Sequence, residues 1–360
     1  MDGIVIIDKP QGMTSHDVVS FLRRKTGVKR IGHSGTLDPM ATGVLPVFIG
    51  KATRLIEYAV RQGDAEAKVY RCVMRLGIRT DTDDIWGTVL EGGGVAASEN
   101  FCDADHHETE YRSAEYQGAE YRNVEYRGIK LPGPEEIERV LKGFEGHIRQ
   151  KPPMYSAVKI DGRKLYEYAR KGETVDEGLI KERDVYVKHI TVMEVDEKQG
   201  EVFFDIHCSK GVYIRTICAD AGRILGCGAV MSSLRRLKSD GFSIEAAIPL
   251  EDLRSEDNEL PLLPMDTPIL WMPRVELDSE YAKAFAQGQI IDLRQCLPEG
   301  VLHSLSEEAL HDAVTILRVY GSKGFFGVGE LLEGFCLKPK KIIIGTSQNI
   351  SEHGGNKNGQ

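Results

Sequence analysis

The 360-residue sequence has no run of eighteen apolar residues, which is about the length that a helix needs to span a bilayer. Its first residues carry no basic stretch followed by an apolar segment and a cleavage site, so no secretory signal is expected. Hydrophobic residues make up 41% of the sequence and charged residues 28%, as in ordinary globular proteins. We therefore expect a soluble, cytoplasmic protein that has no membrane partner.

Cysteine pairs are lacking too. The seven cysteines form no CxxC pair and no spacing typical of a zinc site, which favours reduced thiols over disulfides or metal binding. The segment that runs from Cys102 to His107 contains acids and histidines, but its neighbours have the composition of a flexible insertion. The sequence predicts no metal site there or elsewhere.

An excess of positive charge is the third absence. Lys and Arg number 46 against 55 Asp and Glu, a net charge of -9, which argues against nucleic acid because phosphate contacts depend on cations. The cations are clustered, however, and such clusters are typical of RNA-binding surfaces. We expect three clusters to line one such surface: Arg23-Arg24-Lys25 with Lys29-Arg30, Arg235-Arg236 with Lys238, and Lys338-Pro339-Lys340-Lys341.

The most informative stretch that is present covers residues 32–45, GHSGTLDPMATGVL. Its three glycines allow a close approach of another molecule to the backbone, and Pro39 stiffens the residue after Asp38. A carboxylate presented in this way can act as a nucleophile. The alternative is a structural Asp-Pro turn between two elements.

Hydrophobic patterns predict the regular elements on both sides of this stretch. Strands are expected over residues 4–7, 44–49, 69–76, 184–195 and 201–214, the last two forming a hairpin. Helices are expected from an N-cap at Ser15 to Gly27, from Pro134 onward, and over 216–225 up to Gly226. Short strands and glycines dominate between the proline-rich stretch at 261–268 and Ile344.

The length is sufficient for two domains. We expect a catalytic domain over 1–262 with an insertion at 91–130, a small β domain over 266–346, and a disordered tail over 347–360. The insertion contains a degenerate pentapeptide repeat over 109–128, whose period gathers its tyrosines on neither a helix face nor a strand face. An exposed segment is expected, and a contact of its Tyr and Arg residues with RNA stays open.

Five separated motifs resemble those of the bacterial TruB family of tRNA pseudouridine-55 synthases. They are Asp8–Ser15 and the stretches 32–45, 150–170, 208–216 and 234–236, and Tyr70, preceded by Lys68, matches a tyrosine of the family as well. The resemblance implies an α+β fold, with a pseudouridine-synthase-type mixed, largely antiparallel sheet and flanking helices. It also implies a small C-terminal PUA-like β domain that binds RNA.

The resemblance implies roles for eight residues. Asp38 would be the catalytic nucleophile, Arg215 its ion-pair partner, and Tyr70 the residue that stacks on the target base and assists the proton step. Tyr213 is expected on the strand that ends just before Arg215, close to it in space. The substrate-binding residues would be His33, Tyr213, Leu234, Lys9 and Tyr155, with the motif of Lys9 packing behind the active-site loop.

The implied reaction isomerises uridine 55 in the T-loop of tRNA to pseudouridine, through a flipped-out base and without a cofactor. Glycoside hydrolases place two carboxyl groups at an anomeric carbon, whereas only Asp38 is evident here, which favours isomerisation over hydrolysis. The expected partner is the T-stem-loop of tRNA, with no obligate protein partner and a monomeric enzyme. Two alternatives stay open: a tRNA-folding chaperone that acts without catalysis, and a carboxylate-dependent nucleosidase.

Overall fold

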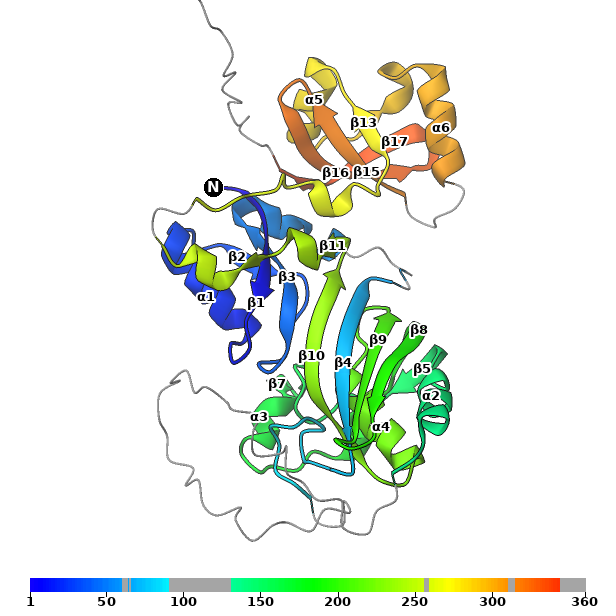
Figure 1. Ribbon diagram of the computed structural model, residues 1–360. Helices are drawn as coiled ribbons and strands as arrows, with labels where there is room; N and C mark the ends of the chain where they lie inside the picture. The colour runs from blue at the N-terminus through cyan, green and yellow to red at the C-terminus, as the bar shows by residue number, and fades with distance from the viewer. Residues whose placement is uncertain (60–63, 65, 91–130, 256–258, 310–314, 344–360) are drawn as a thin grey trace, which may run out of the picture. The chain divides into compact units, whose positions relative to one another are not determined.

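The computed structural model describes residues 1–59, 64, 66–90, 131–255, 259–309 and 315–343 (Figure 1). The chain divides into two compact units. The larger contains Val5–Phe48 and Val60–Pro261, and the smaller contains Met1–Ile4, Ile49–Ala59 and Leu262–Gln360. The predicted insertion at 91–130, with its repeat and the Cys102–His107 segment, and the predicted tail lie outside the described residues.

A mixed sheet forms the larger unit, in the order β12-β1-β3-β10-β4-β9-β8-β5, with β2 paired to β3 and β11 to β10. The strands are β1 (Gly3–Lys9), β2 (Ile31–His33), β3 (Thr42–Ile49), β4 (Lys68–Leu76), β5 (Gly146–Gln150), β8 (Arg183–Asp196), β9 (Glu201–Cys208), β10 (Ala229–Ser239), β11 (Phe242–Ser243) and β12 (Ile248–Pro249). The β3–β10 and β1–β12 pairs are parallel, whereas β10–β4, β4–β9, β9–β8 and β8–β5 are antiparallel. The predicted mixed, largely antiparallel sheet is confirmed.

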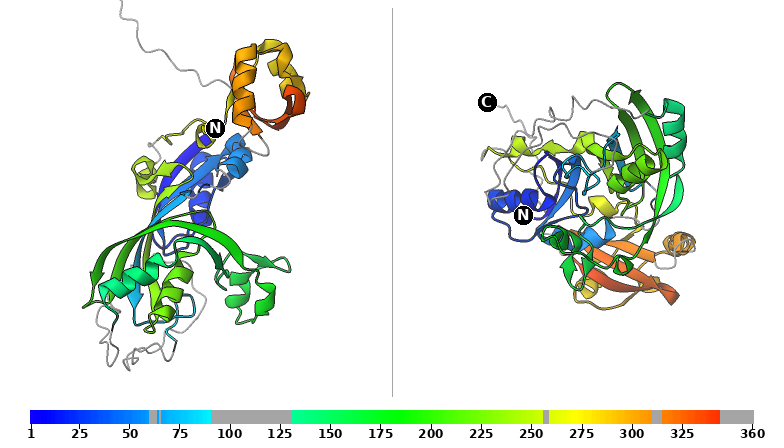
Figure 2. Two further views of the ribbon diagram at one scale, coloured as in Figure 1. Left: turned by 90° about the vertical axis from the view of Figure 1, so that its right-hand side faces the viewer. Right: turned by 90° about the horizontal axis from the view of Figure 1, so that it is seen from below.

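Two helices, α2 (Pro134–Lys142) and α4 (Ile214–Ile224), cover one face of this sheet, as Figure 2 shows. Alternate residues of β4 and β9, such as Cys72 and Phe204, point to that face and pack with Ile217 of α4 and Ile137 of α2. Pro134 is the first residue of α2, as predicted. A small hairpin, β6 (Lys159–Ile160) with β7 (Arg163–Lys164), leads into the short helix α3 (Leu165–Ala169). In the part of the chain that the structure describes, every helix is too short or too polar to cross a bilayer.

The N-cap of helix α1 (Ser15–Thr26) lies one residue earlier than predicted. Thr14 is the N-cap, and it forms a reciprocal capping box with Asp17. Gly27 ends the helix in the left-handed conformation (φ 69°), as predicted. Ser15 is instead free to bond elsewhere, and its hydroxyl accepts a hydrogen bond from the Leu37 N–H at 2.8 Å.

The predicted strand 201–214 is too long. Strand β9 ends at Cys208, Gly211 adopts a φ of 90°, and Tyr213 is the N-cap residue of α4. Val212, Tyr213 and Ile214 have high strand propensity, but the burial of Ile214 and Ile217 in the core selects a helix here. Arg215 therefore lies in the first turn of α4, and the expectation that Tyr213 shares a strand with the residues before it is wrong.

The smaller unit contains a five-stranded sheet in the order β13-β15-β16-β17-β14. Its elements are β13 (Arg274–Glu276), α5 (Ser279–Ala286), β14 (Ile291–Asp292), α6 (Glu299–Ala309), β15 (Thr315–Gly321), β16 (Gly324–Leu332) and β17 (Cys336–Ile342). Phe285 of α5 and Leu317 of β15 are central to its separate core. The predicted small C-terminal β domain is confirmed, and with it the α+β class.

Candidate active site

Asp38 lies in a loop between β2 and β3, residues 34–41, which we call the Asp38 loop. Leu37, Met40 and Ala41 anchor the loop in the main core. At Gly43 (φ 101°), a Cβ atom would lie 2.2 Å from the Arg236 carbonyl oxygen, so only glycine allows β3 to approach β10 this closely. The core anchors and the close β3–β10 contact fix the Asp38 loop, while the Asp38 side chain keeps 36% of its surface exposed.

Arg215 meets the Asp38 carboxylate from α4. Its Nε lies 3.0 Å from Asp38 Oδ2, and its own side chain is only 5% exposed. The remaining nitrogens donate to the carbonyl oxygens of Thr82 (3.1 Å) and Tyr155 (2.9 Å). A buried guanidinium with fixed partners orients the carboxylate and favours its ionised form.

A second acid, Asp84, shares the same guanidinium, and sequence reasoning missed it. Its Oδ2 lies 3.5 Å from an Arg215 terminal nitrogen, while its Oδ1 accepts hydrogen bonds from the Thr82 hydroxyl and the Trp86 N–H. Burial raises the pKa of Asp84, and the nearby Arg215 acts in the opposite direction. The expectation of a lone acid is therefore corrected. Because Asp84 is buried and already bonded, it does not offer the second open carboxylate that hydrolysis uses.

Tyr70 and Leu234 belong to the same core cluster as the anchors of the Asp38 loop. Both are almost buried, with Tyr70 9% exposed and Leu234 6%. Burial raises the pKa of Tyr70 to about 12, although the Arg236 guanidinium opposes this shift. Tyr70 is therefore a neutral phenol at physiological pH.

Tyr213 and Tyr155 lie near Arg215. The Tyr155 carbonyl accepts a hydrogen bond from Arg215, and Tyr213 is the N-cap residue of α4, two residues before it. The Tyr213 N–H donates to Gln150 Oε1 at 2.9 Å, and its carbonyl accepts from Gln150 Nε2 at 3.2 Å. Both tyrosine side chains are half-buried. The structure thus brings two of the predicted substrate-binding residues to the neighbourhood of the Asp38–Arg215 pair.

Lys9 and His33 lie on strands that border the Asp38 loop. Lys9 is fully buried, and its Nζ donates to the carbonyl oxygens of Pro10 (2.8 Å), Met13 (2.7 Å) and Pro39 (3.3 Å). Burial lowers the pKa of Lys9 to about 7, while the charge of Asp38 opposes this. The half-buried His33 has a lowered pKa, mainly through burial, and its Nδ1 bonds to none of the described residues.

Comparison with known proteins assigns the chain to a family. Residues 23–125 and 108–214 match the model for the TruB family pseudouridylate synthase (N terminal domain). A protein of Alkaliphilus oremlandii named tRNA pseudouridine synthase B is 41% identical over 292 residues, which cover 81% of this chain and 83% of that protein. The chain belongs to the TruB family.

Further matches extend the TruB family assignment along the chain. Residues 215–269 match the tRNA pseudouridylate synthase B C-terminal domain, and residues 273–343 match the pseudouridine synthase II TruB C-terminal model, a PUA-like fold. A protein of Synechococcus sp. with the same name is 36% identical over 344 residues, 95% of this chain and 98% of that protein. A solved H/ACA RNP bound to a substrate RNA containing 2'-deoxyuridine shares the fold, with a TM-score of 0.60 at 21% identity, covering 94% of this chain and 84% of that chain.

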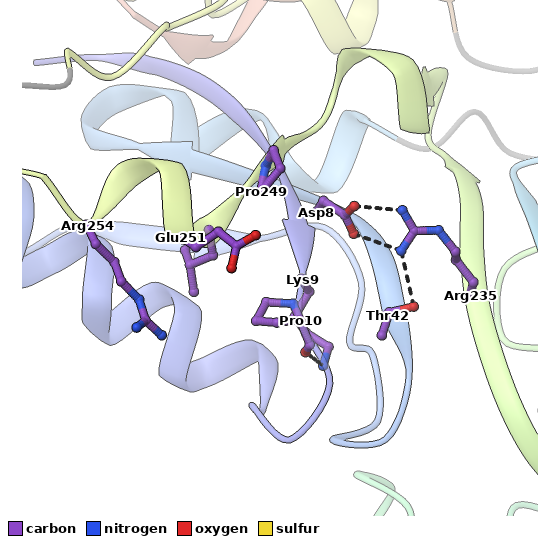
Figure 3. Close-up of a pocket in the computed structure, with 9 residues that line it drawn as sticks. Asp8, Lys9, Pro10, Thr42, Arg235, Pro249, Glu251 and Arg254 are labelled. Carbon is purple, nitrogen blue, oxygen red and sulfur yellow. Dashed lines mark hydrogen bonds and ion pairs between the residues drawn. The ribbon is translucent and has the colours of Figure 1, made fainter. Parts of the chain in front are cut away.

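In this TruB family member, a cavity of about 230 Å³ is lined in part by Lys9 and by Thr42, the residue that follows the Asp38 loop (Figure 3). On its wall, Arg235 makes a two-point ion pair with Asp8 (3.1 and 2.6 Å) and donates to the Thr42 hydroxyl at 3.3 Å. This network joins β10, β1 and the start of β3, as Figure 3 shows. The lining residues are Asp8, Lys9, Pro10, Thr42, Arg235, Pro249, Leu250, Glu251 and Arg254.

The neighbouring Arg236 is different. It is only 1% exposed, whereas the Arg235 side chain is 40% exposed. Adjacent residues of a strand point to opposite faces, so the central position of β10 places one of the two arginines inside. The expectation that both line an RNA-binding surface is therefore wrong for Arg236.

Asp83 provides a pH-dependent test of the turn behind Arg215. Burial raises the pKa of the Asp83 carboxyl from 3.8 to about 6, so this carboxyl group binds its proton more tightly in the native state than in the unfolded chain. The stability that this group contributes is fully present below its unfolded pKa and is lost as the pH rises through 6. Asp83→Asn should raise stability at pH 7.5 by about 1 kcal/mol, discounted for partial exposure, and should have no effect at pH 3.5.

Thermal unfolding at both pH values would measure this difference, which corresponds to about 2–4 °C in melting temperature. Asn tolerates the positive φ of Asp83 (60°), so the backbone is not strained by the change. Glu197→Gln in the exposed β8–β9 turn is the matched control. A gain in stability of the same size at both pH values would show that the gain does not come from the raised pKa of Asp83.

Proposed function

We propose that this chain is a tRNA pseudouridine synthase that isomerises uridine 55 in the T-loop, with Asp38 as the nucleophile. The observation that carries the proposal is the half-exposed Asp38 carboxylate 3.0 Å from the buried Arg215 guanidinium, in a TruB family chain. Relatives that match almost end to end are named for this activity. The acid is thus presented outward and fixed from within.

The reaction breaks the bond from N1 of uracil to C1′ of the ribose, turns the base, and joins C5 to C1′. A proton leaves C5 and N1 gains one, so composition and oxidation state are unchanged. The carboxylate of Asp38 assists this exchange by covalent attack on C1′ or on the base ring. The uridine must first leave its stack, because neither atom is accessible within a folded loop.

The surrounding residues then have distinct roles. Tyr70 stacks on the flipped base as a neutral phenol, Leu234 forms the opposite wall, and Tyr213 closes the pocket beside Arg215. His33 contacts the rearranged loop of the RNA. We assign Lys9 to positioning, because its three N–H groups are already bonded to carbonyl oxygens behind the Asp38 loop.

We further infer that the enzyme acts as a single chain in the cytoplasm, and that its PUA-like domain adds contacts to tRNA. Tyr155 is assigned to the RNA-facing side of the site, since its carbonyl already holds Arg215 and its ring is only half-buried. The proposal requires no metal ion and no cofactor. The nucleophile, the base stack and the RNA contacts are all supplied by side chains.

The test uses the purified full-length protein and an unmodified tRNA transcript in a buffer that contains a chelator. We expect one pseudouridine, mapped chemically to position 55. A modified uridine in another arm would overturn the assignment of the substrate site, and released uracil would indicate a nucleosidase. Refolding of the transcript without any conversion would favour the chaperone alternative.

A further inference from the structure

Arg236 is a buried charge whose hydrogen bonds reach both ends of the Asp38 loop. Its Nε donates to the Val44 carbonyl at 2.7 Å, just beyond the loop. Its terminal nitrogens donate to the carbonyls of Gly35 (3.2 Å) and Thr36 (3.4 Å), near the beginning of the loop. Arg236 makes no ion pair with any residue in the described part of the chain, although burying a cation is costly. Its hydrogen-bond partners are instead backbone carbonyl oxygens in the Asp38 loop and just after it.

The same guanidinium also reaches Tyr70. The two residues are directly opposite each other in the β10–β4 pair, so their side chains lie on the same face of the sheet. The guanidinium lies close enough to lower the pKa of the Tyr70 hydroxyl, against the larger effect of burial. One side chain therefore connects the loop that carries Asp38 to the aromatic ring proposed to stack on the base.

A second set of hydrogen bonds, which we call the Ser34 tether, holds the loop at Ser34, one residue before Gly35. Ser34 donates from its hydroxyl to Asp240 Oδ2 at 2.6 Å, and Lys68 Nζ bonds to Asp240 Oδ1 at 2.8 Å and to the Ser239 hydroxyl at 2.7 Å. The Lys68 and Asp240 side chains are 6% and 0% exposed. At Gly35, a Cβ would lie 3.3 Å from Lys68 Nζ and 3.5 Å from an Arg236 nitrogen, so the backbone runs closely past both cations.

We propose that Arg236, supported by the Lys68–Asp240 pair, is a positioning residue that sets the place of Asp38 relative to Tyr70 and Arg215. The inference rests on the proposed role of Asp38. Arg236 is buried and acts only through the groups it holds. Arg rather than Lys is required, because a planar fork reaches several carbonyl oxygens at fixed angles and an ammonium does not.

The first test is Arg236→Lys, measured as single-turnover pseudouridine formation beside tRNA binding and thermal unfolding. Displacement of a reacting group by about 1 Å can cost about 100-fold in rate, and we expect a loss of this size with tRNA affinity within about twofold. Arg71→Lys is the matched control, since Arg71 of β4 makes an exposed two-point pair with Asp205 of β9. A folded Arg236→Lys enzyme with the wild-type rate would overturn the proposal.

A second variant keeps the test decisive where Arg236→Lys fails to fold. Ser34→Ala removes only the link from the loop to Asp240, and we expect a rate loss of about 5-fold with unchanged tRNA affinity. Ser232→Ala is the control. It deletes a hydroxyl of β10 that donates to the Val73 carbonyl of β4, and it should leave the rate unchanged. Equal rates for the two serine variants would overturn the proposed role of the Ser34–Asp240 hydrogen bond in positioning the loop.

The connection to Tyr70 is tested by a double-mutant cycle. The effects of Arg236→Lys and Tyr70→Phe on the rate should be non-additive, because the two side chains lie opposite each other on one face of the β10–β4 pair. Additive effects would overturn this connection. Failure of the proposed function is recognised separately, since it would appear as full activity of Asp38→Asn, whatever the Arg236 and Ser34 variants do.

Discussion

Replacing Asp38 by Asn is expected to abolish pseudouridine formation while leaving tRNA binding intact. The amide has the size of the carboxylate and can still accept a hydrogen bond from Arg215, so the loop should keep its place. It has no charge and is a poor nucleophile. Loss of a covalent nucleophile costs about 10⁴-fold or more in rate, and we expect a loss of this order in a single-turnover assay.

Asp205→Asn is the control for this substitution. Asp205 is also an aspartate paired with an arginine, Arg71, but it lies on β9 in an exposed ion pair. Its variant should convert tRNA at the wild-type rate. Conversion by Asp38→Asn within tenfold of the wild-type rate would contradict a nucleophilic role, and a weaker affinity for tRNA without slower chemistry would indicate a binding role instead.

The local pattern of the sequence was sufficient for much of the scaffold. The apolar run at 4–7 lies within β1, and the Gly27 stop and the Pro134 start correspond to the observed end of α1 and beginning of α2. These features are decided by neighbours in the chain. The boundary between β9 and α4 was not predicted, because there the core overrides the strand propensity of Val212–Ile214.

The site depends on contacts between distant segments, and local patterns do not encode these. The motif resemblance linked Asp38 to Arg215, and the structure brings the two together. Asp84 is not predicted, because it lies far from Arg215 in the sequence and the pattern around it does not indicate that the two residues meet. The sequence places Arg236 in a basic cluster but predicts no strand over 229–239, so the alternation of side chains along β10 does not enter the prediction.

Replacing Arg215 should produce the other large effect, and its design can separate catalysis from stability. Arg215→Met leaves Asp84 buried without its counter-charge, which raises the pKa of Asp84 further. Removing one partner of a buried pair costs about 3–5 kcal/mol, so we expect a loss of stability in this range by denaturant unfolding. The rate of conversion should fall at least about 100-fold, because Asp38 also loses its fixed donor.

The double variant Arg215→Met with Asp84→Asn distinguishes the two roles of the arginine. The amide at position 84 carries no charge, so part of the lost stability should return. Asp38 still has no guanidinium beside it, so activity should stay low. Recovery of activity together with stability would mean that Arg215 serves the fold alone, whereas recovery of stability without activity assigns the 3.0 Å contact with Asp38 to the reaction.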